Sequence, residues 1–207
     1  MLRSISASYV YHYQACNHSI NMSQIKLILL DFDGTLADTC RANGEAYIEA
    51  LSEVGITLTL QDYTTKYFGM RCQEFMQSVG INDEQLAIKV RTRKVELYPN
   101  YFSTVRLNTP LWEWCKMMRT MGAKVWIVST GHIDNITNVM RYLNLDSGID
   151  GIISGDDVPQ SKPNPECFLR AMEIEGVHPA ETIIFEDSPV GLEAAKQSGA
   201  AFVKISL

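Results

Sequence analysis

Five apolar runs alternate along the chain with helical segments, and this alternation constrains the fold more than any other feature of the sequence. The first run is rich in leucine and β-branched residues with little polar alternation, which is typical of a strand covered on both faces, and the other four apolar runs resemble it. The runs are Ile25 to Asp31, Lys124 to Ser129, Gly151 to Ser154, Thr182 to Glu186 and Ala201 to Ile205. Strands that alternate with helices form right-handed βαβ units. The sequence therefore predicts an α/β fold with a doubly wound parallel sheet, a Rossmann-like core.

Helix start and stop signals lie between these runs. In the segment TPLWEWCKMMRTMG, Thr109 is the predicted N-cap, Pro110 the first helical residue and Gly122 the stop. Another helix is predicted to start at Pro165 and to end at Gly176. These signals place helices where the crossover connections of a parallel sheet require them.

One interval breaks the alternation, because between Thr39 and about Leu107 the sequence shows helical periodicity and no strand signal. A stretch of this length cannot be a bare crossover loop. We therefore predict a helical cap domain at residues 39–107, inserted into a core formed by residues 22–38 and 108–207. The two connections, near residues 37–41 and 107–110, are expected to act as hinges.

Composition and charge exclude several classes of function. The chain has 207 residues, of which 46% are hydrophobic, and a formal net charge of −6. A nucleic-acid or membrane surface needs clustered Lys and Arg, so neither partner is expected. No apolar run is long enough for a signal peptide or a membrane span. Residues 1–21 are predicted to be an N-terminal extension, either poorly ordered or packed on the surface.

The cysteines indicate a reducing compartment. They are odd in number and form no CxxC motif, so reduced thiols in a cytoplasmic protein are the expected state. Their positions are Cys16, Cys40, Cys72, Cys115 and Cys167. We expect a monomer or a weak dimer.

Polar side chains follow the carboxyl ends of four predicted strands. They are Asp31 and Asp33 after the first, Ser129 and Thr130 after the second, Ser161 and Lys162 after the third, and Glu186 and Asp187 after the fourth. In open α/β sheets the binding site lies at this edge. The sequence therefore predicts that these groups converge on one site.

The acids of that site require a cation, because converging carboxylates repel one another and raise their pKa values. Only oxygen ligands are available, so the expected ion is hard and divalent, with Mg²⁺ the best fit. Lys162 adds positive charge and Ser129 a hydroxyl, and together these groups suit a phosphoryl substrate. Gly34 allows a sharp turn that sets Asp31 beside Asp33. One of the two carboxylates can then be the nucleophile while its neighbour transfers the proton.

Each of these signals has a structural explanation when it is taken alone. A DxD sequence before a Gly-Thr turn is often a solvated strand end or a helix cap, and a single lysine is usually on the surface. Glu186 and Asp187 are also suitable charges for the N-terminus of the following helix. The ordered appearance of all four groups, each after its own strand, favours a catalytic site.

Four motifs in this order resemble the haloacid dehalogenase superfamily of phosphohydrolases. The resemblance runs from about Ile25 to the C-terminus and is specific to members with a small helical cap after the first motif, such as β-phosphoglucomutase-like and phosphoglycolate phosphatase-like proteins. The motifs are DFDGT from Asp31, VWIVSTG with Ser129, SKPNPECF with Lys162, and IIFEDSPVGLEAAKQSGA with Glu186 and Asp187.

The resemblance implies a role for each motif residue. Asp31 would be the nucleophile that forms an aspartyl-phosphate, and Asp33 the general acid and base. Mg²⁺ would be held by the Asp31 side chain, the Asp33 backbone carbonyl and Asp187, with Glu186 as an inner or outer ligand. Phosphoryl oxygens would be bound by Ser129, Lys162, Thr130 and Gly131.

A phosphatase acting on a small phosphorylated metabolite is the leading functional prediction. The closest alternative is a phosphosugar mutase, in which a cap residue such as Arg71 in FGMRC would bind the distal anionic group of the substrate. A dehalogenase is disfavoured because Asp33 supplies a second acid. A phosphonate hydrolase needs a cap lysine, but Lys89 and Lys94 are expected on a solvated helix face.

Two alternatives are not enzymes: a signalling receiver domain and a catalytically silent protein that binds a partner. A receiver domain also phosphorylates an aspartate at a strand end, but it needs no insert of the size seen between Cys40 and Leu107. A catalytically silent, partner-binding member of the superfamily is the other alternative. It is disfavoured because every motif residue that the chemistry requires is present.

Overall fold

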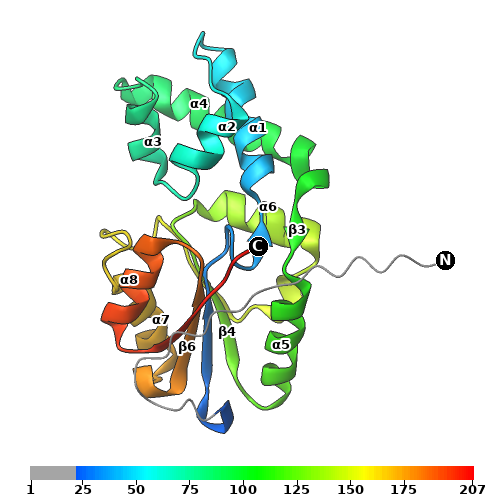
Figure 1. Ribbon diagram of the computed structural model, residues 1–207, viewed down its shortest axis with the longest axis vertical. Coiled ribbons are helices and arrows are strands. Elements are labelled where there is room, and N and C mark those ends of the chain that lie inside the picture. The colour runs from blue at the N-terminus through cyan, green and yellow to red at the C-terminus, as the bar shows by residue number, and fades with distance from the viewer. Residues whose placement is uncertain (1–21) are drawn as a thin grey trace, which may run out of the picture.

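The computed structural model describes residues 22–207, and the predicted N-terminal extension lies outside the described residues. A five-stranded sheet with strand order β5-β4-β1-β6-β7 forms the core, and all of its pairings are parallel (Figure 1). The strands are β1 Leu27–Leu30, β4 Lys124–Val128, β5 Gly151–Ile153, β6 Thr182–Glu186 and β7 Ala201–Lys204. This confirms the predicted α/β fold.

Strand β1 occupies the centre of the sheet because both of its faces are apolar. Ile28 and Leu30 belong to one hydrophobic cluster, while Leu27 and Leu29 belong to a second cluster on the opposite face. The side chains of a strand alternate between faces, so this leucine-rich run supplies both halves of the core. Its neighbours β4 and β6 pair with it in register from Leu27 to Leu30.

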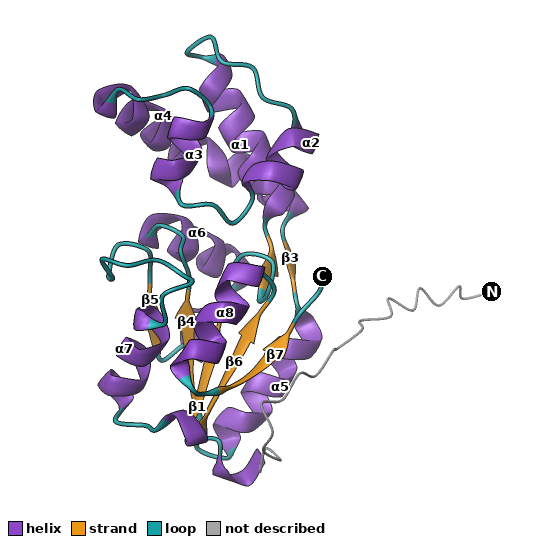
Figure 2. Cartoon of the chain, turned by 60° about the vertical axis from the view of Figure 1, so that its left-hand side comes forward, coloured by secondary structure: helices purple, strands orange, loops and turns teal. Residues whose placement is uncertain are grey.

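Two layers of helices cover the sheet (Figure 2). The helices are α5 Thr109–Thr120, α6 Ile133–Leu143, α7 Glu166–Glu175 and α8 Pro189–Ser198. Apolar residues of α5 and α6 join the cluster that contains Leu30. Those of α7 and α8 join the cluster that contains Leu29. Short 3₁₀ turns complete the core at Met22–Gln24, Asp146–Gly148 and Pro179–Glu181.

The predicted start of α5 is one residue late. The structure places the N-cap at Asn108, whose side-chain oxygen accepts from the backbone N–H of Leu111 at 3.3 Å. The same side chain donates to the backbone carbonyl of Thr35 at 3.0 Å. Asn108 therefore ties α5 to the loop after β1, a contact that the cap preferences of Thr109 and Pro110 do not reveal.

A helical insert of residues 40–104 lies beyond the carboxyl end of the sheet (Figures 1 and 2). Its elements are α1 Cys40–Ser52, α2 Leu60–Asp62, the π-helical turn η2 Tyr63–Tyr67, α3 Cys72–Ser78, α4 Glu84–Leu97 and the 3₁₀ segment η3 Tyr98–Thr104. At its base, β2 Ala37–Asp38 pairs antiparallel with β3 Arg106–Leu107. The insert agrees with the predicted helical character, but β3 was missed because two residues carry no readable strand pattern.

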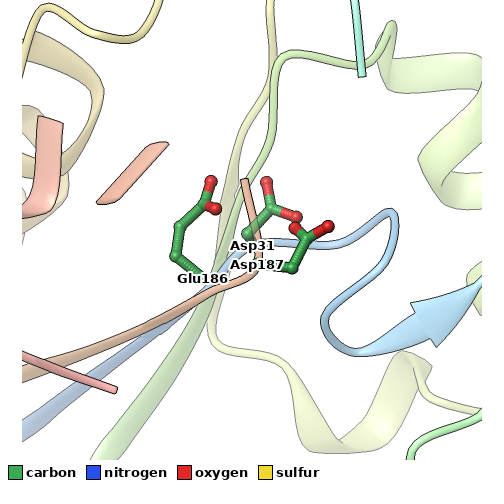
Figure 3. Close-up of side chains that lie close together, drawn as sticks. All are labelled: Asp31, Glu186 and Asp187. Carbon is green, nitrogen blue, oxygen red and sulfur yellow. The ribbon is translucent and has the colours of Figure 1, made fainter. Parts of the chain in front are cut away.

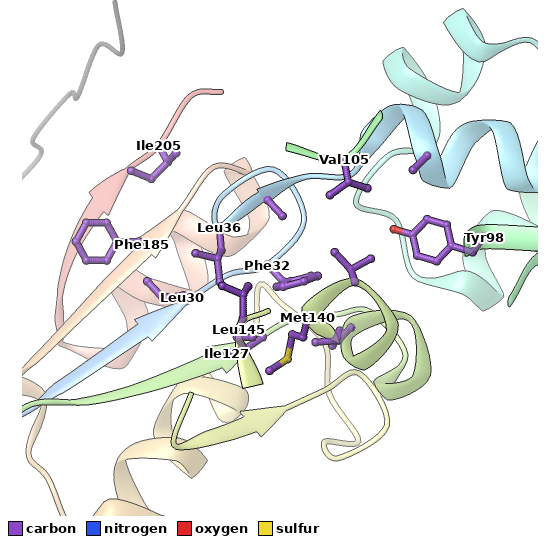
Figure 4. Packing of buried hydrophobic residues seen from close by; sticks show 14 of the residues in the cluster. Leu30, Phe32, Leu36, Tyr98, Val105, Ile127, Met140, Leu145, Phe185 and Ile205 are labelled. Atoms are coloured by element: carbon purple, nitrogen blue, oxygen red, sulfur yellow. The ribbon is translucent and has the colours of Figure 1, made fainter. Parts of the chain in front are cut away.

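The insert and the core share apolar packing. Tyr98 and Val105 from the insert side belong to the same buried cluster as Phe32, Leu36 and Leu30 of the core (Figure 4). Because this cluster is continuous, the insert is seated on the loop after β1. Within residues 22–207, no helix combines the length and the apolar character that crossing a membrane requires.

The Leu29→Ala substitution tests how strongly the central strand supports the fold. The Leu29 side chain is 0% exposed, and its removal should lower the free energy of unfolding by about 2–5 kcal/mol through lost burial and a residual cavity. Urea unfolding of the purified protein measures the change. The matched control is Ile174→Ala on α7, where the side chain is 55% exposed and a change within about 0.5 kcal/mol is expected. Equal losses in the two variants would contradict this account of the core.

Candidate active site

The loop after β1 turns sharply and presents the first acidic motif. Gly34 has a φ of +93°, and a Cβ atom at this position would overlap the Asp187 carboxylate. The Gly34 N–H donates to the carbonyl of Ala37 at 2.8 Å, and the Ala37 N–H donates to Phe32 at 3.0 Å. Glycine is therefore required both by the backbone conformation and by the close approach of the fourth motif.

Three carboxylates meet at the ends of β1 and β6. Ligand oxygens of Asp31, Glu186 and Asp187 all lie within 4.8 Å of one another (Figure 3). The hydroxyl of Thr35 donates to Asp187 at 3.2 Å, and the backbone N–H of Ser188 donates to Glu186 at 2.7 Å. Burial, followed by the charge of Glu186, raises the pKa of Asp187 to about 6. These oxygens form a donor set that suits a hard divalent cation.

Lys162 supplies a positive charge inside this cluster. Its ammonium donates to Asp31 at 2.7 Å and to Glu186 at 2.8 Å, and it also contacts the carbonyl of Val128 at 3.1 Å. Burial alone would lower the pKa of Lys162, but the two carboxylates raise it above its usual value. Burial also raises the pKa of Asp31, and the nearby ammonium opposes that shift. Lys162 thus partly compensates the acidic cluster.

Asp33 lies in a different environment from Asp31. Its carboxylate accepts hydrogen bonds from the Thr39 hydroxyl and from the Asn43 side-chain amide, the latter at 3.3 Å. Burial raises the pKa of Asp33, and the bond from Thr39 opposes this shift. Its side chain is not a member of the three-carboxylate cluster. The two acids of the motif are therefore only two positions apart in sequence but are held by different partners.

The second motif forms a tight turn after β4. The backbone N–H of Gly131 donates to the Ser129 hydroxyl oxygen at 3.0 Å, and the Ser129 N–H donates to the Ile153 carbonyl of β5 at 2.9 Å. Ser129, Thr130 and Gly131 all line the same pocket as the acids. The structure therefore brings residues of all four motifs to one pocket at the carboxyl edge of the sheet. Ser161, which was also expected there, does not line the pocket, and its buried hydroxyl has no hydrogen-bond partner among the described residues.

The pocket has a volume of about 120 Å³ and lies between core and insert. Core residues that line it include Asp31, Asp33, Ser129, Thr130, Gly131, Lys162, Glu186 and Asp187. Residues of the insert that line it are Asn43, Tyr47, Tyr63, Phe68, Gly69, Met70, Cys72 and Arg91. The acidic edge of the sheet thus faces a mainly aromatic and apolar wall.

Arg71 does not line this pocket. Its guanidinium donates instead to the backbone carbonyls of Gly155 and Val158, at 3.1 and 3.2 Å. These carbonyls belong to the core loop between β5 and α7. Arg71 therefore bridges insert and core and is not part of the lining that contains the acids.

Sequence reasoning missed the buried state of Lys94, which was expected on a solvated face. Lys94 is 0% exposed, and its ammonium donates to the Asn43 side-chain oxygen at 2.6 Å. It also lies 3.6 Å from the ring centroid of Tyr98. Lys94 follows the buried Val90 by four residues and precedes the buried Leu97 by three. This helical spacing was the signal that could have placed the lysine on the inner face. Lys89 is exposed, as expected.

A largely buried cluster of three carboxylates at the carboxyl edge of a doubly wound sheet, facing a helical insert after the first strand, defines a class of hydrolases. The chain belongs to the haloacid dehalogenase-like hydrolase family, whose model matches residues 28–205. This confirms the resemblance that the four motifs indicated.

Relatives cover most of the chain. A phosphoglycolate phosphatase from Aquifex aeolicus is 28% identical over 84% of this chain and 82% of its own. A phosphorylated carbohydrates phosphatase from Thermotoga maritima is 27% identical, with coverage of 84% and 82%. The predicted enzyme class, a phosphoric monoester hydrolase, is supported by the family and by these relatives.

Solved structures share the fold. CbbY from Rhodobacter sphaeroides, in complex with phosphate, has a TM-score of 0.78 and 22% identity, covering 86% of this chain and 84% of its own. A β-phosphoglucomutase from Clostridium difficile has a TM-score of 0.72 and 19% identity, with coverage of 86% and 83%. At these identities the likeness establishes the fold alone.

Substitution of Lys94 by methionine should change how stability depends on pH. Burial lowers the pKa of Lys94 to about 7, opposed by Asp33 and Cys72, and the rings of Tyr47 and Tyr98 also face the ammonium. Between about pH 7 and about pH 10.4, the ordinary pKa of lysine, the Lys94 amine is protonated in the unfolded chain but largely neutral in the folded protein. The free energy of unfolding should therefore rise with pH in this window, by an amount on the order of a few kcal/mol.

Below about pH 7 the cost of burying the ammonium is fully present. The measurement is urea unfolding of wild type and Lys94→Met from about pH 7 to about pH 10. The wild-type curve should rise more steeply than that of the variant. Lys89→Met, on an exposed position of the same helix, is the matched control and should follow wild type. Parallel curves for wild type and Lys94→Met would refute the assignment.

Proposed function

We propose that this protein is a Mg²⁺-dependent phosphatase that hydrolyses a small phosphate monoester through an aspartyl-phosphate on Asp31. The observation that carries the proposal is the division of the first motif. Asp31 lies in the cluster that can hold a cation, whereas Asp33 is held separately at the wall of the same pocket. The relatives named as phosphatases of phosphoglycolate and of phosphorylated carbohydrates support a small phosphorylated substrate.

The donor set fits Mg²⁺, which prefers carboxylate and carbonyl oxygens and retains several waters. The Asp31 side chain, the Asp33 backbone carbonyl and Asp187 would hold the ion, with Glu186 as an inner or outer ligand. When bound, the ion would neutralise charge on the phosphoryl group and favour the ionised form of Asp31.

Two steps complete the reaction. The Asp31 carboxylate attacks phosphorus while the bond to the ester oxygen breaks, and Asp33 gives its proton to that departing oxygen. Water then attacks the aspartyl-phosphate, transfers a proton to Asp33 and releases inorganic phosphate, which regenerates the Asp31 carboxylate. Thr39 and Asn43 position Asp33 for both proton transfers.

Phosphoryl oxygens would be bound by the second and third motifs. The Ser129 hydroxyl, the Lys162 ammonium and the backbone amides of Thr130 and Gly131 are the candidate donors, and all four residues line the pocket. Preorganised donors of this kind stabilise charge that develops on a transferring group.

The helical insert would act as a cap domain, with boundaries at residues 39 and 107. Its paired strands β2 and β3 connect it to the core, and we propose that closure about this connection excludes bulk water during the reaction. The pocket volume of about 120 Å³ is below the roughly 300–1,000 Å³ typical of sites for drug-sized ligands. This favours a small metabolite.

The alternatives receive no specific support. A mutase would use Arg71 to bind the distal group of its substrate, but the Arg71 guanidinium contacts core carbonyls outside the pocket. A phosphonate hydrolase would need a lysine amine that substrate can reach. Lys94 is buried and does not line the pocket, and Lys66 is exposed and paired with Asp62.

We further propose that the enzyme works in the cytoplasm as a monomer or weak dimer, without nucleic-acid or membrane partners. The four cysteines within the described residues are free thiols, which is the usual state in a reducing compartment. The net charge of −6 supports the absence of a broad anionic partner.

Hydrolysis of p-nitrophenyl phosphate tests the proposed chemistry. Wild type should release phosphate with Mg²⁺ and lose activity with EDTA, because the acidic cluster then lacks its cation. Asp31→Asn should lower kcat by about 10⁴-fold or more, as for other lost nucleophiles. Asp146→Asn, on an exposed residue that does not line the pocket, should match wild type. Substantial turnover by Asp31→Asn would rule out the aspartyl-phosphate route.

A second variant, Asp33→Asn, should separate the two steps. A nitrophenolate leaving group needs little protonation, so attack by Asp31 should still occur, whereas water activation should slow by roughly 10²–10⁴-fold. Rapid mixing should show a burst of nitrophenolate of about one equivalent per enzyme, followed by slow turnover. Steady release without a burst, at the wild-type rate, would contradict the role of Asp33.

A further inference from the structure

Two arginines of the helical insert, Arg71 and Arg91, are placed differently relative to the pocket. Arg71 donates to core carbonyls and lies outside the pocket lining. Arg91 belongs to α4 and lines the pocket together with Asp31 and Lys162. Among residues 22–207, no hydrogen bond or ion pair engages the Arg91 guanidinium. Its neighbour Arg93, by contrast, pairs with Glu53 and Glu96.

Two permanently charged cations line the pocket, Arg91 and Lys162. The Lys162 ammonium is already shared between Asp31 and Glu186, whereas the Arg91 guanidinium has no acidic partner among the described residues. The lining contains four carboxylates, those of Asp31, Asp33, Glu186 and Asp187. A second anionic group on a substrate would be repelled by these acids unless a separate cation met it.

The position of Arg91 separates it from the phosphoryl-binding groups. Lys162, Ser129 and Gly131 come from the core, while Arg91 comes from the insert. Four aromatic or apolar residues of the insert line the same pocket, namely Tyr47, Tyr63, Phe68 and Met70. Arg91 and Cys72 also line a neighbouring cavity beside α3 and α4, so the guanidinium marks the insert side of the pocket. A substrate that contacts both sides of the pocket would carry one charged group for the core donors and a second for Arg91, whose side chain is exposed.

We propose that Arg91 binds a second anionic group, a carboxylate or another phosphate, at the end of the substrate remote from the reacting phosphoryl group. The inference rests on the proposed function, since it assumes that the phosphoryl group binds at Asp31. A guanidinium offers a planar pair of donors that matches carboxylate and phosphate oxygens. The enzyme should therefore prefer phosphate monoesters that carry a second anionic group at the remote end over monoesters of the same length whose remote end is uncharged.

The test compares phosphoglycolate with ethyl phosphate, which has a methyl group in place of the carboxylate. Wild type with Mg²⁺ should show the higher kcat/KM for phosphoglycolate. Arg91→Gln should reduce the ratio of the two kcat/KM values by about 10- to 100-fold, the loss expected for a charged hydrogen-bonded pair. Arg91→Lys should retain part of the ratio. Arg93→Gln, on the same helix but paired with Glu53 and Glu96, should leave it unchanged.

Calorimetric binding to the Asp31→Asn protein provides a readout that does not need turnover. In this background phosphoglycolate should bind more tightly than ethyl phosphate, and Arg91→Gln should remove the difference. If neither ester released phosphate, the proposed function would fail, and calorimetry alone would decide the role of Arg91. Phosphate release with equal ratios in wild type and Arg91→Gln, or equal binding of the two probes, would overturn the inference and leave the phosphatase intact.

Discussion

Repulsion among the carboxylates at one edge of the sheet is the constraint on which the rest of this structure depends. Parallel strands necessarily bring their carboxyl ends together, so Asp31, Glu186 and Asp187 must meet. The burial that raises the pKa values of Asp31 and Asp187 makes their joint ionisation costly. Lys162 offsets part of that cost from within the cluster, and the remaining negative charge is what makes the site suitable for a divalent cation.

The second constraint is that neighbouring acids must differ in environment if they are to have different roles. Asp31 faces Lys162 in the core, whereas Asp33 is held by Thr39 and Asn43 at the start of the insert. Asn43 is in turn bonded by the buried Lys94. The hydrogen-bonding partners of Asp33 therefore depend on how α1 and α4 pack, which connects the geometry of the insert to a residue of the core motif.

The parts of the fold that could be predicted are those that short stretches of sequence determine. A strand buried on both faces reads directly as an apolar run, and the acids after it follow from chain order alone. The two-residue strand β3 escaped prediction because it depends on a partner distant in sequence, Ala37. The N-cap was placed one residue late because Asn108 and Thr109 are both favoured cap residues, and the bond from Asn108 to Thr35 that distinguishes the two is not a local feature. Lys94 was wrongly expected on a solvated face because its charge was given more weight than its helical spacing from the buried Val90 and Leu97.

The insert shows why the chemistry of this family is easier to predict than its specificity. Chemical groups of the core occupy fixed positions after successive strands, so motif order alone brings them together. Residues of the insert reach the pocket from separate helices, and sequence could not distinguish the arginine that bridges to the core from the one that lines the pocket. Under the proposed role of Arg91, selectivity depends on how α4 packs within the insert, which is a tertiary feature and not a local sequence pattern.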